Sequence, residues 1–241
     1  MSANPHAIQF GGCLARILQK IWEADLREGP VLLSKWDVSD AFHRCPLRPE
    51  HVGTFAYVVP PLASNPAVYI CIDLVLPMGW VSSPDLFCAT SKTATDMANK
   101  SLHNPAAPYW TYRPTLGTYS TTPSPTASPA RLQHADVYMD DIIAVTQGDQ
   151  NQQTRVSELV LKAIKETYPS TPGEKKYSVS IIKALAGDGD WSQEKDILGW
   201  RINAKKGTLE LSPSRLADLQ DLLAIPPSQR CMDRSFPMLH M

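Results

Sequence analysis

Apolar residues recur along this chain with two different periods. Positions 14–21, 156–164 and 216–223 show the three-to-four-residue spacing of amphipathic helices, and a fourth helix is expected over 82–100. Runs rich in β-branched and aromatic residues, bounded by Pro, Gly or acidic turns, predict strands at 31–36, 54–59, 68–74, 137–139, 142–145, 177–182, 197–202 and 208–211. Several of these runs are joined by short turns, so we expect hairpins mixed with helices.

Residues 102–130 interrupt this pattern. The segment is rich in Pro, Ser and Thr and has few aliphatic residues. Such a segment cannot bury enough apolar area to offset the entropy lost on ordering. The pattern of strands and helices resumes directly afterwards, so we interpret 102–130 as a flexible surface insertion.

Composition narrows the class of protein. The 241 residues are 43% hydrophobic and 20% charged, as in a globular chain. The net charge of −1 argues against binding of nucleic acid through the charge of the whole chain. Five scattered cysteines without zinc spacing are expected to be reduced thiols of an intracellular protein, in the cytoplasm or the nucleus. No run is long and apolar enough for a signal peptide or a membrane span, so no membrane partner is expected.

Two adjacent acids, Asp140 and Asp141, lie between the apolar runs 137–139 and 142–145. This arrangement predicts a hairpin with both carboxylates at its tip. Neighbouring carboxylates repel each other, and a divalent cation relieves that repulsion. Hard oxygen ligands favour Mg²⁺ or Mn²⁺. On this pair alone, an ordinary solvated acidic turn is the favoured interpretation.

Other segments accompany this pair in a definite order. Asp37 ends a β-rich run and is followed by Ala41 and Phe42, the segment 76–84 reads Leu-Pro-Met-Gly-Trp-Val-Ser-Ser-Pro, and 197–200 reads Ile-Leu-Gly-Trp. Together with Tyr-Met-Asp-Asp at 138–141, these segments resemble motifs A, B and C and the Leu-Gly segment of the reverse transcriptases of retroviruses and retrotransposons. The resemblance spans roughly 31–223, with one interruption.

The resemblance implies a fold and a division of the chain. The fold would be α+β, a polymerase palm of antiparallel strands backed by helices, with partial fingers and the start of a thumb. The expected parts are 1–30 (partial fingers), 31–101 (first part of the palm), 102–130 (insertion), 131–211 (second part of the palm) and 212–241 (start of a thumb).

The resemblance also implies a metal site. Asp37 and Asp140 would be the main ligands of two Mg²⁺ or Mn²⁺ ions, and Asp141 would be a less direct third. Two such ions activate the primer hydroxyl and hold the triphosphate during in-line attack. Carboxylates from a central strand and an adjacent hairpin tip suit that task.

Further residues would contact substrates by resemblance. Phe42, beside Ala41, would lie under the incoming sugar and block a 2′-hydroxyl. Met78 and Gly79 would lie near the nucleotide and template. The primer end would contact Tyr138, Met139, Leu198, Gly199 and Trp200. Lys183 matches no motif clearly, and we expect an ordinary surface lysine there rather than a general acid or phosphate contact.

The expected activity is RNA-directed DNA synthesis, with an RNA or DNA template, a DNA primer and deoxynucleoside triphosphates as partners. Few basic residues precede Asp37 and little chain follows for a thumb. A part of a larger polyprotein, a decayed element and an incomplete gene product therefore stay open. One alternative is a catalytically inactive palm that at most binds nucleic acid or protein. A weaker one is an RNA-directed RNA polymerase, which Phe42 disfavours.

Overall fold

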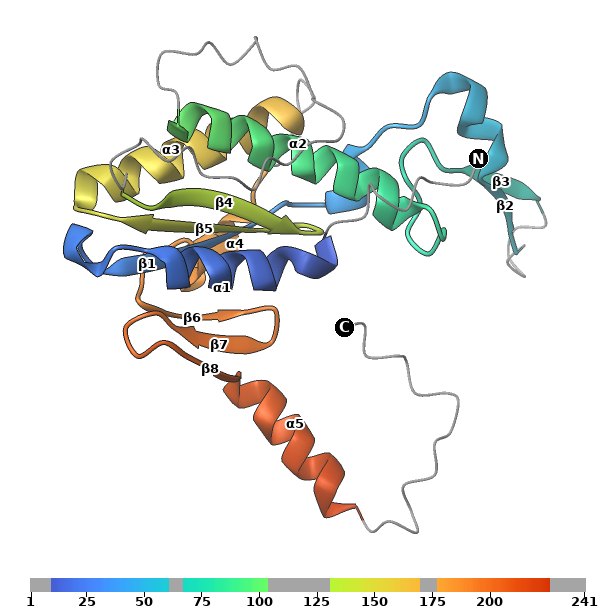
Figure 1. Ribbon diagram of the computed structural model, residues 1–241. Coiled ribbons are helices and arrows are strands. Elements are labelled where there is room, and N and C mark those ends of the chain that lie inside the picture. The colour runs from blue at the N-terminus through green and yellow to red at the C-terminus, as the bar shows by residue number, and fades with distance from the viewer. Residues whose placement is uncertain (1–9, 61–66, 104–130, 170–176, 226–241) are drawn as a thin grey trace.

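The computed structural model describes residues 10–60, 67–103, 131–169 and 177–225. A three-stranded antiparallel sheet of order β1-β5-β4 lies at its centre (Figure 1). Its strands are Val31–Asp37 (β1), Gln133–Tyr138 (β4) and Asp141–Gln147 (β5). β5 is the middle strand and its residues 142–147 are buried. Helices and antiparallel strands are mixed along the chain, which confirms the α+β expectation.

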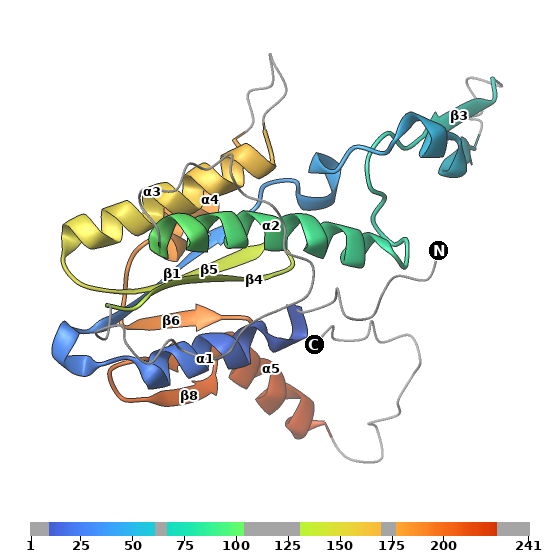
Figure 2. The ribbon, with the colours of Figure 1, turned by 45° about the horizontal axis from the view of Figure 1, so that its top comes forward.

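Alternate side chains of β5 serve opposite faces of the sheet, as the two-residue period of a strand requires. Ile142 and Ala144 join a core formed with the helices Ser83–His103 (α2) and Gln150–Thr167 (α3). Ile143 and Val145 join a second core on the other face, where the helix Cys13–Glu23 (α1) packs. Figure 2 shows α2 and α3 side by side on one face and α1 on the other.

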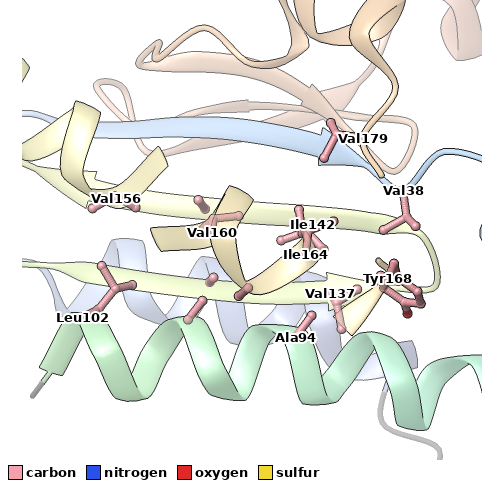
Figure 3. Close-up of a cluster of buried hydrophobic side chains, with 14 of the residues drawn as sticks. Val38, Ala94, Leu102, Val137, Ile142, Val156, Val160, Ile164, Tyr168 and Val179 are labelled. Atoms are coloured by element: carbon pink, nitrogen blue, oxygen red, sulfur yellow. The ribbon is translucent and has the colours of Figure 1, made fainter. Parts of the chain in front are cut away.

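The core under α2 and α3 holds these helices against the sheet (Figure 3). Asp149 begins α3 by accepting a 3.0 Å hydrogen bond from the Gln152 amide, the usual N-cap arrangement. The helix then presents the buried side chains of Val156, Val160 and Ile164 to the sheet. Each fully buried side chain of this size contributes about 1.5–3 kcal/mol through removal of apolar area from water.

The second core joins the central sheet to a smaller one. Glu194–Ile197 (β6), Trp200–Asn203 (β7) and Thr208–Leu211 (β8) form an antiparallel meander. Ile197 and Ile202 are buried with Ile17 of α1. The strand predicted over 197–202 forms only from residue 200, as β7, and pairs with β8 in the hairpin expected there. Leu198 and Gly199, with φ values of 53° and 82°, separate it from Ile197 of β6. Two residues with positive φ make a tight turn between β6 and β7.

Two elements extend away from both cores in the two ribbon views. Ala56–Val59 (β2) and Tyr69–Ile72 (β3) form an isolated two-stranded sheet, which confirms the hairpin expected over 54–74 with shorter strands. Pro213–Ala224 (α5) confirms the last helix. None of its residues is buried. Short 3-10 helices complete the description at Phe10–Gly12, Leu26–Glu28, Ala41–Arg44 and Pro49–Thr54.

The strand predicted over 177–182 was wrong. Val179 alone makes an isolated bridge, to Val38 just beyond β1. The Ser180 amide donates to the Asp37 carbonyl at 2.9 Å, and the chain then turns into the helix Ile181–Lys183 (α4). A π-helical turn, Ala184–Asp188, follows. The apolar run 177–182 therefore forms one bridge and the start of a helical turn. A longer strand would need further pairing with β1, and β1 ends at Asp37.

Parts of the expected division fall outside the described residues. Segments 1–9 and 226–241 of the outer parts do so, and so does the insertion 102–130 apart from 102 and 103, which end α2. Within the ranges that are described, no helix combines the length and apolar character that crossing a membrane requires.

Candidate functional site

Strand pairing brings the three acids of the predicted metal site to one end of the central sheet. Asp37, the last residue of β1, is directly opposite Asp141, the first residue of β5. Asp141 is also paired with Tyr138 of β4, so Asp140 lies in the turn of the β4–β5 hairpin. The Asp140 carbonyl accepts a 3.0 Å hydrogen bond from the Val38 amide. Residues far apart in sequence therefore meet here.

The hairpin turn has an unusual backbone at Met139. Its φ of 56° lies in the left-handed region, which two-residue hairpin turns require and which costs a non-glycine residue about 1 kcal/mol. The Met139 sulfur lies 3.3 Å from the Cys88 sulfur of α2. Met139 was expected to lie beneath the primer end, and this contact places its side chain against α2.

Asp140 and Asp141 lie in an environment that disfavours their charged forms. Burial raises the pKa of Asp141 to about 6. The ammonium of Lys35 opposes this shift, and the charges of Asp140 and Asp37 add to it. Burial also raises the pKa of Asp140. Carboxylates gathered in a partly buried site gain from a nearby cation, because it offsets both desolvation and mutual repulsion.

Lys183 supplies one such cation. Its Nζ donates to Asp37 Oδ1 at 2.5 Å, and Asp37 is only 7% exposed. This hydrogen bond raises the pKa of Lys183, and the charge of Asp37 adds to the effect. The expectation of an ordinary surface lysine was therefore wrong. No spacing in the sequence relates positions 37 and 183, and only the folding of 178–180 against the end of β1 brings them together.

The donor types at this end of the sheet suit a hard divalent cation. Asp37, Asp140 and Asp141 offer carboxylate oxygens from two adjacent strands and a turn. As their side chains stand, however, no three His, Cys, Asp or Glu residues in the described parts of the chain form a metal-binding group. One oxygen of Asp37 is engaged by Lys183. The residues fit Mg²⁺ or Mn²⁺ in type and strand position, provided that Asp37 exchanges its partner.

The predicted nucleotide residues Ala41 and Phe42 follow β1 in a 3-10 turn. Asp40, with φ of 57°, reverses the chain before them. Phe42 packs against Phe87 of α2 with ring centroids 4.9 Å apart. Its side chain is partly buried and packs against the core under α2 and α3. Phe42 is thus held against α2 five residues after Asp37.

Met78 and Gly79 lie in the turn that precedes α2. Met78 is 73% exposed, and Gly79 has φ of 90° with open space where a Cβ would be. The Ser83 hydroxyl donates to the Pro77 carbonyl at 2.6 Å and holds this turn at the helix start. Both residues are accessible to a ligand, and no contact joins them to the three acids.

A cavity of about 770 Å³ lies next to Asp141. It brings together four of the five residues predicted to contact the primer, namely Tyr138, Leu198, Gly199 and Trp200. The turn between β6 and β7 thus faces the acidic hairpin across this cavity. The further lining residues that sequence reasoning missed include Lys35, Ser212 and Arg215.

Arg215 of α5 approaches the β6–β7 turn closely. A Cβ added to Gly199 would lie 3.3 Å from Arg215 Nε, so glycine suits this position in both space and backbone conformation. Nothing in the pattern around 215 relates it to residue 199.

Comparison of the sequence with known proteins does not assign this chain to a family. No model of a protein family matches this chain, and no curated protein is similar to it. Interpretation of the site therefore depends on its residues and their geometry.

Proposed function

We propose that this chain carries the palm of a reverse transcriptase and catalyses template-directed DNA synthesis by two-metal nucleotidyl transfer. The observation that carries the proposal is the pairing of Asp37 with Asp141 beside the turn at Asp140. Acids from two motifs that resemble this family lie at one end of one sheet, as the chemistry requires.

The chain's own residues have distinct parts in this proposal. Asp37 and Asp140 would hold the ions, and Asp141 would support them from the first position of β5. Bound there, Mg²⁺ or Mn²⁺ would lower the pKa of the primer hydroxyl and neutralise charge on the triphosphate. Phe42 would lie against the sugar and exclude a 2′-hydroxyl, since its ring is backed by Phe87.

The cavity beside Asp141 is the proposed place of the primer terminus. It is bounded by Tyr138 on the acidic hairpin and by Leu198 and Gly199 on the β6–β7 turn. A primer end held between these two turns would have its 3′-hydroxyl next to the carboxylates. Such positioning supplies much of the rate in phosphoryl transfer, because the reacting atoms are already aligned.

Primer extension tests the proposal directly. The purified chain is given an RNA template, a DNA primer and deoxynucleotides in Mg²⁺ and, separately, in Mn²⁺. We expect Asp140→Asn to reduce extension more than about 10²-fold, since it removes a charge that stabilises the reacting centre. Glu166→Gln, a change on the exposed surface of α3, is the matched control and should extend like wild type.

Other outcomes separate the alternatives. Equal extension by Asp140→Asn and wild type would contradict the proposal. Equal use of ribonucleotides would indicate an RNA polymerase. Binding of primer–template without extension by the wild-type chain would favour an inactive palm that only binds nucleic acid. The net charge of −1 is the observation on the side of that last alternative.

A further inference from the structure

The lysine that pairs with Asp37 is held in place by backbone structure. The Ser39 amide donates to the Ser178 carbonyl at 3.0 Å, and the Ser180 amide donates to the Asp37 carbonyl at 2.9 Å. The Ala184 amide then donates to the Ser180 carbonyl at 3.0 Å and starts the helical turn that contains Lys183. These three backbone hydrogen bonds hold the helical turn beside the end of β1, so the Lys183 side chain reaches Asp37.

The Lys183 ammonium acts on all three acids. Besides its hydrogen bond to Asp37, it feels the negative charges of Asp141 and Asp140, and its own charge acts back on both of them. The other nearby cation, Lys35, is paired with Asp188 at 3.0 Å. Among the residues whose contacts are described, Lys183 is therefore the direct counter-charge of Asp37.

A divalent cation on Asp37 Oδ1 would share that oxygen with this ammonium, which lies 2.5 Å from it. Mg²⁺ binds oxygen at about 2.0–2.1 Å, so even on different lone pairs of the oxygen the two cations would lie only about 4 Å apart. Two cations so close would also repel each other strongly. The lysine side chain is 53% exposed, so it has a path into solvent.

We propose that Lys183 is an internal counter-cation that competes with the divalent metal for Asp37, so that metal binding displaces its ammonium. The inference rests on the proposed function, because it assumes that Asp37 is a metal ligand. Lys183 stabilises the acidic end of the sheet when no metal is bound. The same contact weakens metal affinity, because it must be broken before Asp37 can coordinate.

Mn²⁺ binding to the whole chain, followed by electron paramagnetic resonance of the free ion, tests this without nucleic acid or activity. Removing the competitor in Lys183→Gln should tighten Mn²⁺ binding about three- to tenfold, the modest value reflecting a charge-assisted hydrogen bond whose lysine is half exposed. Lys183→Arg keeps a cation and should bind Mn²⁺ no more tightly than wild type. Lys165→Gln removes the same charge from the exposed surface of α3 and should leave Mn²⁺ affinity unchanged.

A second readout guards against a folding defect. Without metal, Lys183→Gln should melt at a lower temperature than wild type, and saturating Mn²⁺ should remove that difference. Unchanged or weaker Mn²⁺ binding by a folded Lys183→Gln chain would overturn the inference and leave Lys183 as a structural tether.

The experiments give different results if the inference fails and if the proposed function fails. If Asp140→Asn loses Mn²⁺ binding while Lys183→Gln binds like wild type, the metal site stands and the counter-cation is wrong. If Lys183→Gln binds more tightly but wild type extends no primer, the counter-cation stands and the polymerase proposal loses support. Absence of Mn²⁺ binding by every variant overturns the inference together with the metal site.

Discussion

His134 lies on β4 opposite Val145 of β5, close to the cleft of about 260 Å³ that Lys20 and His103 also line. Burial lowers the pKa of His134 to about 4. Asp136 opposes this shift, and the charges of Lys20, Lys92 and His103 add to it. An imidazole that is costly to protonate in the folded chain is protonated readily in the unfolded chain, where its pKa is about 6.5. Acid therefore favours unfolding through this residue.

The predicted pH dependence follows from that difference. The contribution of His134 is constant above about pH 6.5 and is lost progressively as the pH falls toward 4. From pH 7.5 to 5.0 the free energy of unfolding should drop by about 2 kcal/mol more in wild type than in His134→Gln. Urea unfolding of both chains at the two pH values measures this. His43→Gln, at an exposed position, should behave like wild type. Identical pH dependence of wild type and His134→Gln would refute the argument.

At the scale of elements, α1 is fixed to the central sheet by an ion pair as well as by Ile17. Arg16 Nε and Nη2 donate to the two Asp136 carboxylate oxygens, at 2.5 Å and 2.9 Å. Asp136 on β4 is 1% exposed and also accepts from the Val137 amide. A buried carboxylate depends on such partners, because water cannot replace them.

Removing the arginine should therefore destabilise the chain more than removing both partners. We expect Arg16→Met to lower the free energy of unfolding by about 3 kcal/mol, since it leaves a buried charge unpaired. The double variant Arg16→Met/Asp136→Asn should recover part of that loss. A double-mutant cycle in urea measures the coupling. Arg27→Met breaks an exposed pair with Asp25 and should match wild type within error. Additive effects of the two changes would show that the pair is not coupled.

The same scale shows how far sequence reasoning reaches. Helices α1, α2, α3 and α5 and the β4–β5 hairpin were predictable, because each has its own local period or turn signal. The structure of the run 177–182 was not predictable, because it depends on β1 ending at Asp37, which leaves the run a single bridge before α4 begins. The break at Leu198 and Gly199 needs two positive φ values, which the apolar pattern conceals. Lys183, Arg16 and Arg215 acquire their partners only through tertiary packing.

At the scale of the whole molecule, stability is concentrated in the two cores around the central sheet. Ile143 is fully buried, whereas Tyr69 and Ile70 of β3 are 55% and 66% exposed. An isolated two-stranded sheet is at best marginally stable in water. Leu219 of α5 is 40% exposed. The two extensions contribute little buried apolar area, so they should open without unfolding of the cores.

Hydrogen exchange should therefore divide the chain into two classes. Amides of β5 should exchange only through global unfolding, while those of β2, β3 and α5 should exchange through local opening at far lower free energy. Stability measurements should agree. Ile143→Ala should cost about 2–5 kcal/mol, because it leaves a cavity in a packed core. Tyr69→Ser and Leu219→Ser should change the global free energy of unfolding by less than about 0.5 kcal/mol, as surface substitutions do. Protection of β3 equal to that of β5 would contradict this division. It would mean that the hairpin is covered in solution and that the exposed apolar residues of β2 and β3 form an interface.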